Sequence, residues 1–364
     1  MDRTSNILFR FHIDLPLFGG VVVMCALGLV VLYSASDQST DIVFKQVARI
    51  LIGFIVMIAM AQVPPRRLAR WALALYVIGL ALLGLVLIVG IGRGAQRWLD
   101  FGVLRFQPSE LMKLAVPLTV ASFLADKVLP PSLRTLTIAL VLALLPAMMI
   151  IEQPDLGTAI LVATSGLFVL FFAGISWRFM RNSTIVVLAA APLAWFSMHD
   201  YQRRRVLTLF DPGQDPLGAG YHIIQSTIAV GSGGTYGKGW LNGTQSHLEF
   251  LPERATDFIF AVYCEEFGLV GVVVMLIAYA MIIVRGVQIA LDAQEMFSRL
   301  IAASLVLTLF IYLFVNMGMV TGQLPVVGVP LPMVSYGGTS LVTILAGFGI
   351  LMSVQTHRKF IADT

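Results

Sequence analysis

Residues 248–268 read Leu-Glu-Phe-Leu-Pro-Glu-Arg-Ala-Thr-Asp-Phe-Ile-Phe-Ala-Val-Tyr-Cys-Glu-Glu-Phe-Gly, and they join a polar loop to a long apolar helix. The helical part carries two carboxylates, and the loop part carries four charged residues, Glu249, Glu253, Arg254 and Asp257. Carboxylates at the mouth of a membrane helix are costly to desolvate, so they point to function rather than packing. The stretch therefore predicts a membrane helix, with Glu265 and Glu266 about two turns in, that begins beside a functional site.

The composition of the 364 residues is that of an integral membrane protein. Hydrophobic residues make up 58% and charged residues only 12%, with a mean hydropathy of +0.88, whereas a soluble domain is about one quarter charged. The net charge of +4 is explained by basic residues in the loops that orient the protein in the membrane. No basic run is interleaved with aromatic residues, so a nucleic-acid partner is not expected. Cys25 and Cys264 both lie in apolar runs, so the sequence indicates neither a disulfide framework nor a metal site.

Ten apolar runs approach the roughly 20 residues that a spanning helix needs. The first begins near Leu15 and is long enough to span, so no cleavable signal is expected. We predict an all-α polytopic membrane protein with a single integral domain over 1–364 and spans near 15–35, 46–63, 71–91, 108–125, 134–151, 157–173, 183–198, 257–284, 300–320 and 336–355.

Basic residues predict the orientation, because Lys and Arg are enriched in short cytoplasmic segments. With both termini inside, the short external loops contain only four, namely Lys45, Arg93, Arg97 and Arg105. The internal segments contain thirteen: Arg3, Arg10, Arg66, Arg67, Arg70, Lys127, Arg134, Arg178, Arg181, Arg285, Arg299, Arg358 and Lys359. We therefore expect cytoplasmic termini, and a large external loop at 199–256 that is functional and folds back onto the membrane surface.

Asp257 allows two compatible interpretations. It could cap the N-terminus of the eighth helix, since Asp accepts backbone N–H groups there. It could also be a general base, because the helix dipole keeps a carboxylate ionised at that end and a base must be ionised.

Glu110 and Lys113 are three residues apart and share a face of the fourth helix. They form either a structural ion pair between helices or a charged wall of a cavity, and in both cases they avoid lipid.

Three further side chains are candidates for the same site. Asp155 could simply cap the sixth helix. Arg49, one turn into the second helix, could snorkel to the interface or hold a lipid phosphate. Arg97, in the loop before the fourth helix, could act in the same way.

Two glycine patterns in the sequence indicate local structure and not a catalytic or ligand-binding site. The run Gly231-Ser-Gly-Gly-Thr-Tyr-Gly-Lys-Gly239 lacks the GxxxxGK[ST] spacing of a phosphate loop, so we interpret it as a flexible turn. Gly318 and Gly322 form a G-x-x-x-G pair that permits close helix packing and offers a surface to a partner helix.

Several motifs together resemble the SEDS family (shape, elongation, division, sporulation), and the resemblance covers nearly the whole chain. Gly243-Thr-Gln-Ser246, Pro252-Glu-Arg254 and a short N-terminal tail favour the elongation members over the division members. The motifs are Gln107-Pro-Ser-Glu-Leu-Met-Lys113, Gln153-Pro-Asp-Leu-Gly-Thr158, Asp215-Pro-Leu-Gly-Ala-Gly-Tyr-His222, Phe250-Leu-Pro-Glu-Arg-Ala-Thr-Asp-Phe-Ile-Phe260 and Pro330-Leu-Pro-Met-Val-Ser-Tyr-Gly-Gly338.

The resemblance implies a peptidoglycan glycosyltransferase that joins lipid II units outside the inner membrane and releases undecaprenyl diphosphate. The family's essential acid matches Asp257, and other cavity positions match Glu110, Lys113 and Asp155. Many relatives carry His two residues before that acid, where this chain has Ala255. A class B penicillin-binding protein and other elongation-complex membrane proteins are the implied partners.

The expected reaction is a single inverting displacement with Asp257 as base and Arg49, Arg97 or Lys113 offsetting charge on the departing diphosphate. A divalent metal (Mg or Mn) could share that work, although no ligand cluster requires one. A lipid flippase fits the ten helices and their charges, but no repeated halves with paired broken helices are visible. A scaffold for a transpeptidase would need no base at Asp257.

Overall fold

The computed structural model describes residues 12–358 except 92–96, 101, 103, 104, 199, 215–217 and 248–252. Glu249, Arg3, Arg10, Arg93, Lys359 and parts of the motifs that begin at Asp215 and Phe250 lie outside this described part. Among the described residues, a helix occupies every predicted span: α2 (Leu15–Ala35), α3 (Thr40–Ala61), α4 (Pro65–Val89), α5 (Pro108–Ala125), α6 (Leu133–Ile151), α7 (Leu156–Phe172), α8 (Trp177–Ser197), α12 (Ile259–Leu291), α13 (Met296–Val320) and α14 (Thr339–Thr356).

The chain is an all-α polytopic membrane protein, as the sequence predicts. Within the described ranges, seven helices are long and apolar enough to cross a membrane, and α7 is a shorter apolar helix. Several predicted spans begin later than the helices themselves, because a count of apolar residues leaves out the polar first turn of a helix. α3, α4 and α8 each begin six residues before their predicted spans, at Thr40, Pro65 and Trp177 rather than at 46, 71 and 183. Arg49 is therefore more than two turns into α3, not one.

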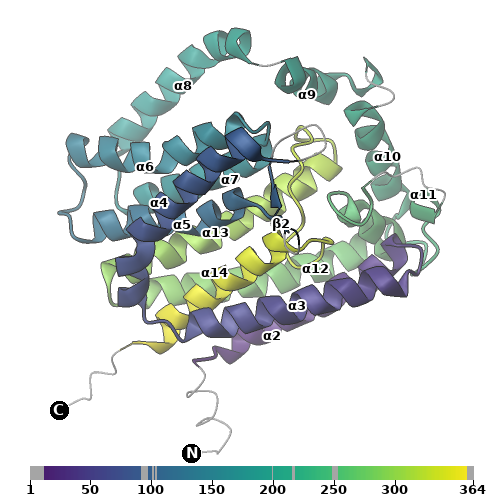
Figure 1. The fold of residues 1–364 in the computed structure, drawn as a ribbon. Coiled ribbons are helices and arrows are strands. Elements are labelled where there is room, and N and C mark those ends of the chain that lie inside the picture. Colours follow the sequence, from purple (N-terminus) through teal and green to yellow (C-terminus); the bar gives the residue numbers. More distant parts are fainter. Residues whose placement is uncertain are drawn as a thin grey trace, which may run out of the picture.

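The helices pack into one bundle in which α3 lies along α14 and α2 lies along α12 (Figure 1). A second group is formed by α4, α5, α6 and α7. α13 joins the two groups, because it packs on α5 and α7 of this group and on α12 of the other. The rings of His12 and His357 stack with centroids 4.1 Å apart, so the two ends of the described chain meet. An even number of membrane crossings places both ends of a chain on the same side, and this contact agrees with it.

The predicted external loop is largely helical. It contains α9 (Asp200–Phe210), the short 3-10 helix η1 (Pro212–Gln214), α10 (Ala219–Ser232) and α11 (Thr244–His247). α10 packs on the bundle, where the hydroxyl of Ser226 donates to the carbonyl of Val320 at 2.9 Å. α8 and α9 arch away from the other helices in Figure 1.

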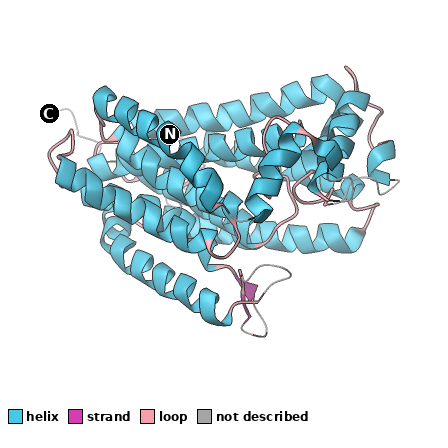
Figure 2. Cartoon of the chain, turned by 90° about the horizontal axis from the view of Figure 1, so that it is seen from above, coloured by secondary structure: helices cyan, strands magenta, loops and turns pink. Residues whose placement is uncertain are grey.

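A small β-hairpin before α5 was not predicted. β1 (Leu99–Asp100) pairs antiparallel with β2 (Arg105–Phe106), with Leu99 opposite Phe106. The hairpin lies at the margin of the bundle (Figure 2) and brings the preceding residues Arg97 and Trp98 to a cavity wall.

The interpretation of residues 231–239 as a flexible turn is wrong, because this run docks into a break in α12. Gly268 interrupts the helix with φ 61° and ψ −163°. The amides of Leu269 and Val270 donate to carbonyls of the glycine-rich run at 3.0 Å, and two amides of the run donate to α12 carbonyls at 2.9 and 3.0 Å. Backbone groups freed inside a membrane helix need such partners.

The two glutamates inside α12 are held by this docked run and by α2, and neither lines the cavities described below. Glu265 is fully buried and its Oε1 accepts from Lys238 Nζ at 2.7 Å and from Thr244 Oγ1 at 3.1 Å. Glu266 accepts a hydrogen bond from the hydroxyl of Ser34. Glu265 and Glu266 therefore link α12 to neighbouring segments of the chain, which is a structural role.

The interpretation of Gly318 and Gly322 as an open packing surface is also wrong. Gly318 is buried, and a Cβ there would come within 2.7 Å of the Leu324 side chain. Gly322 lies beyond the end of α13 with φ 72°, beside Ile223 and Thr227 of α10. Both glycines face the chain itself.

Candidate functional site

Five of the six predicted site residues line one polar cavity of about 420 Å³. Its walls come from α5, α7 and α14, from the loops that precede α5, α7 and α12, and from the loop 321–338. The five residues are Arg97, Glu110, Lys113, Asp155 and Asp257.

A larger cavity of about 1070 Å³ adjoins the first and shares Trp98, Glu110, Gly338 and Thr339 with it. Arg49, the sixth predicted residue, lies there. The rest of its lining is mostly apolar and includes Ile52, Leu111, Leu114, Val342 and Ala346.

Asp257 does not cap α12, so that interpretation is wrong. The N-cap position is Phe258, and no side chain makes a capping hydrogen bond there. The half-buried carboxylate of Asp257 instead lines the cavity beside Gly328, where a Cβ would make an ordinary van der Waals contact with Oδ2 at 3.4 Å.

The surroundings of Asp257 raise its pKa to about 6. Burial is the largest cause, and the negative charges of Glu253 and Asp155 add to it, while Arg205 and Arg97 act in the opposite direction. A carboxylate with a raised pKa is a stronger base than a free one, and it is still ionised at neutral pH.

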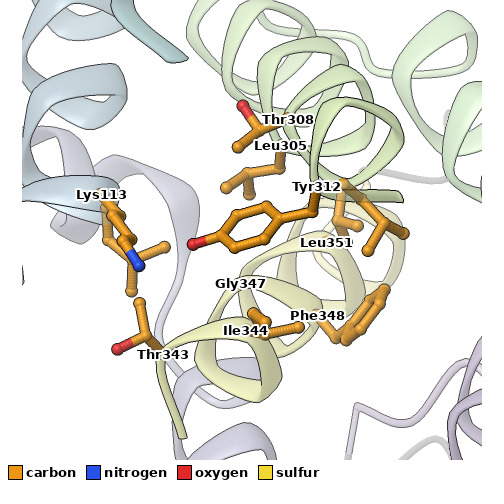
Figure 3. A pocket seen from close by; sticks show the side chains of 11 residues that line it. Lys113, Leu305, Thr308, Tyr312, Thr343, Ile344, Gly347, Phe348 and Leu351 are labelled. Atoms are coloured by element: carbon orange, nitrogen blue, oxygen red, sulfur yellow. The ribbon is translucent and has the colours of Figure 1, made fainter. Parts of the chain in front are cut away.

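Glu110 and Lys113 form the predicted ion pair. Lys113 Nζ lies 2.7 Å from Glu110 Oε1, and both side chains are only 6% exposed. Both residues lie on α5, so the pair does not join two helices as one interpretation had it, whereas its position at the wall of the polar cavity agrees with the other interpretation. Lys113 Nζ lies 5.3 Å from the ring centroid of Tyr312, and Figure 3 shows both around a small inner cavity of about 50 Å³.

Asp155 caps α7, as one interpretation of the sequence predicts, because its Oδ1 accepts from the amide of Thr158 at 3.3 Å. Its Oδ2 accepts from Gln107 Nε2 at 3.2 Å and lies 3.8 Å from Arg97 Nε. Arg97 also donates to the carbonyl of Pro154. Arg97 is thus fixed at the cavity wall by the loop that precedes α7.

Arg49 places its guanidinium 4.4 Å from the ring centroid of Tyr336, on the wall between the two cavities. Within the described part of the chain it forms no salt bridge, whereas Lys113 and Arg97 each lie beside a carboxylate. Arg49 is therefore the site cation with the most charge left for an anionic ligand.

Sequence reasoning missed a polar stripe on α13 and the folded loop that follows it. Side chains spaced by four residues share one helical face, and this spacing in an apolar helix was a usable signal for Ser304, Thr308, Tyr312 and Asn316. Residues 331–335 of the loop 321–338 are buried although they are not helical, with Ser335 only 5% exposed. Irregular backbone at membrane depth is tolerated where it lines a cavity.

No group of three or more His, Cys, Asp or Glu side chains in the described ranges is placed to hold a metal ion. In the same ranges, four cationic side chains line the two cavities, those of Arg49, Arg97, Arg105 and Lys113, and Arg105 lies beside Asp100.

These features define a polytopic membrane protein with a charged cavity beside an apolar one. A family model described as "Cell cycle protein" and named for FtsW, RodA and SpoVE matches residues 7–360, so the chain belongs to this family, the SEDS family named above. It is 54% identical over 357 residues to the peptidoglycan glycosyltransferase MrdB of Escherichia coli K12, which spans 98% of this chain and 96% of the relative.

Two solved structures share the fold. One, described as the structural coordination of polymerization and crosslinking by a peptidoglycan synthase complex, aligns at a TM-score of 0.83 with 34% identity, over 95% of this chain and 99% of its own. The crystal structure of the Thermus thermophilus rod shape determining protein RodA aligns at 0.72 with 29% identity, over 95% and 98%. The predicted resemblance to SEDS elongation members is confirmed.

Proposed function

We propose that this chain is a peptidoglycan glycosyltransferase that polymerises lipid II during cell elongation and so maintains rod shape. The observation that carries the proposal is the junction of the polar cavity, with Asp257 at its wall, and the larger apolar cavity, with Arg49 at its edge. A lipid-linked disaccharide has the same two parts, a polar sugar and an apolar chain. The 54% identity to a peptidoglycan glycosyltransferase supports the same activity.

Asp257 is the proposed base. The 4-hydroxyl of the acceptor sugar attacks the anomeric carbon of the donor, its proton passes to the Asp257 carboxylate, and the bond to the lipid diphosphate breaks. One displacement inverts an α-linked donor into a β-1,4 linkage. Diphosphate leaves with little protonation, so a single base is enough.

Arg49 is the proposed ligand of the donor diphosphate. Its planar guanidinium can bind phosphate oxygens in a bidentate way, and the apolar lining beside it suits the polyprenyl chain. Arg97, at the wall of the polar cavity, stabilises the growing negative charge on the departing diphosphate. Lys113 is neutralised by Glu110, so we assign that pair to shaping the cavity and to binding sugar hydroxyls.

The activity should rise with pH through about 6 and then level off, because only ionised Asp257 accepts the proton. The measurement is kcat/KM for polymerisation between pH 4.5 and 8, a range of about four units around that pKa. Glu253→Gln removes one of the charges that raise the pKa, so it should move the rise to lower pH. A flat profile in both proteins would contradict the assignment.

Two other classes, a lipid flippase and a non-catalytic scaffold, make different predictions for purified protein in vesicles with labelled lipid II. A glycosyltransferase forms glycan polymer and releases undecaprenyl diphosphate. A flippase moves lipid II between leaflets without polymer, and a scaffold does neither. Absence of polymer under conditions in which the folded protein binds its partner would overturn the proposal.

We place the protein in the inner membrane with both termini in the cytoplasm and the cavity facing the periplasm. The asymmetry of basic residues supports this orientation. A reporter fused after residue 358 should be cytoplasmic, and a tag inserted near residue 213, beside η1, should be accessible from the periplasm.

A class B penicillin-binding protein is the proposed partner, together with other elongation-complex membrane proteins. The similarity to a subunit of a solved peptidoglycan synthase complex supports this. The segment from α10 to α11 rests on α12 beside the loop that carries Asp257. A periplasmic partner that shifted this segment would favour a competent arrangement.

Polymerase activity of the chain alone should therefore be low and should rise when the cognate transpeptidase is added. A transpeptidase inactivated at its own nucleophile should activate equally, because the effect is conformational. The check is the rate of polymer formation in three matched reactions, with no partner, active partner and inactive partner. Equal rates with and without bound partner would rule out this mode of regulation.

A further inference from the structure

Three consecutive carbonyls around the proposed base are each held by a hydrogen bond from a distant part of the chain. The carbonyl of Ala255 accepts from the amide of Tyr336 at 2.8 Å. The carbonyl of Thr256 accepts from the hydroxyl of Ser335 at 2.6 Å. The carbonyl of Asp257 accepts from Asn316 Nδ2 at 2.9 Å. This segment is not helical, so these bonds replace those that a helix would supply.

Asn316 joins two non-helical segments of the cavity wall. It lies on α13 with its side chain fully buried, and its Nδ2 donates a second hydrogen bond to the carbonyl of Val329 at 2.7 Å. One amide group thus fixes the backbone of Asp257 relative to that of Val329. The residue before Val329 is Gly328, which lies beside the Asp257 carboxylate, since a Cβ on it would be 3.4 Å from Oδ2.

Ser335 holds the loop from the other side. Its hydroxyl accepts from the amide of Leu331 at 2.8 Å while it donates to Thr256. Gln46 of α3 braces the same turn, since its side chain accepts from the amide of Gly337 at 3.3 Å and donates to the carbonyl of Ser335 at 3.4 Å. The wall carrying the base is therefore tied to α3 and α13 at once.

We propose that Asn316 and Ser335 are positioning residues that aim the Asp257 carboxylate into the polar cavity. This inference rests on the proposed function and adds to it the residues that hold the base. Neither side chain needs to touch substrate, because each acts through the backbone of the segment 255–257. Without them the carboxylate would sample several positions, and a misplacement of about 1 Å can cost about 100-fold in rate.

The test compares Asn316→Ala with Ser304→Ala. Ser304 is a matched control because it is fully buried on the same stripe of α13 and also donates to a distant carbonyl, that of Ser165 at 2.7 Å. It lies outside both cavities. Polymerisation is measured over a range of lipid II concentrations, with the transpeptidase present. We expect Asn316→Ala to lower kcat at least about 10-fold and to leave KM within about threefold of that of the unchanged protein, because substrate binding is intact. Ser304→Ala should change neither kcat nor KM.

A double variant separates positioning from general loosening. In an Asp257→Glu background, where the longer side chain has already displaced the carboxylate, Asn316→Ala should cause a smaller loss of kcat than it does in the unchanged protein. An additional loss of the same size would overturn the proposal, as would equal behaviour of Asn316→Ala and Ser304→Ala. If Asp257→Asn itself keeps full activity, the base assignment fails instead, and the two failures are distinguishable.

Ser335 supplies a second, independent pair of variants in case Asn316→Ala does not fold. Ser335→Ala removes the hydroxyl, whereas Ser335→Thr keeps it. We expect Ser335→Ala to lower kcat, and we expect Ser335→Thr to retain at least about half of the activity that Ser335→Ala loses. Equal activity of the two variants would contradict a role for the hydroxyl.

Discussion

Asp257→Asn is expected to abolish glycan polymerisation while the protein still folds and inserts in the membrane. Asparagine keeps the size of the side chain, and no capping hydrogen bond is lost, since Asp257 caps no helix. What disappears is the proton acceptor, and general base catalysis contributes about 100- to 10,000-fold. The check is polymer formation by purified protein with its partner present.

Asp41→Asn is a suitable control for this change. It makes the same chemical replacement at an exposed carboxylate on α3 that is paired with Lys45 and lies outside both cavities. It should polymerise like the unchanged protein, and both variants should unfold at the same temperature in detergent. Near-normal polymer from Asp257→Asn would remove the base from the mechanism.

Breaking the pair between Glu110 and Lys113 is expected to have the second largest effect, on stability. Both side chains are almost completely buried, so replacing either leaves an unpaired charge, which costs about 3–5 kcal/mol in such surroundings. Glu110→Gln and Lys113→Met should each lower the unfolding temperature strongly. The double variant Glu110→Lys with Lys113→Glu should recover stability, because it restores a pair.

The exposed pair of Asp41 and Lys45 is the matched control, since it is also a short contact within one helix. Water already solvates those charges, so breaking that pair should leave the unfolding temperature nearly unchanged. If the charge-swapped double variant at 110 and 113 is no more stable than the worse single variant, the two residues do not stabilise each other.

The helices could be predicted from the sequence because each membrane-spanning helix needs a run of about 20 mostly apolar residues. Their ends were less accurate, since a helix such as α4 begins in polar residues, with Arg66 and Arg67 in its first turn. The docking of residues 231–239 could not be foreseen. It depends on the break at Gly268, and a glycine in an apolar run does not disclose a positive φ.

The candidate site was predicted residue by residue wherever a charge stood in an apolar context, as for Glu110 and Asp257. Such charges need a partner or a cavity, so their positions are informative before any fold is known. Asn316 belongs to the four-residue polar spacing of α13 and Ser335 to the motif 330–338, but neither pattern indicates what the side chain does. Their importance comes from which carbonyls they meet, at separations of 59 and 79 residues along the chain, and only the fold brings those groups together.

The most direct measurement of the central claim follows purified protein, reconstituted with its transpeptidase and supplied with labelled lipid II. Glycosidic bonds formed and undecaprenyl diphosphate released are counted in the same reaction. The mechanism requires the two counts to rise together in equal amounts, with every new linkage β, and requires both to vanish in Asp257→Asn. Lipid II that crosses the bilayer without polymer, or polymer that forms equally well without the carboxylate, would contradict it.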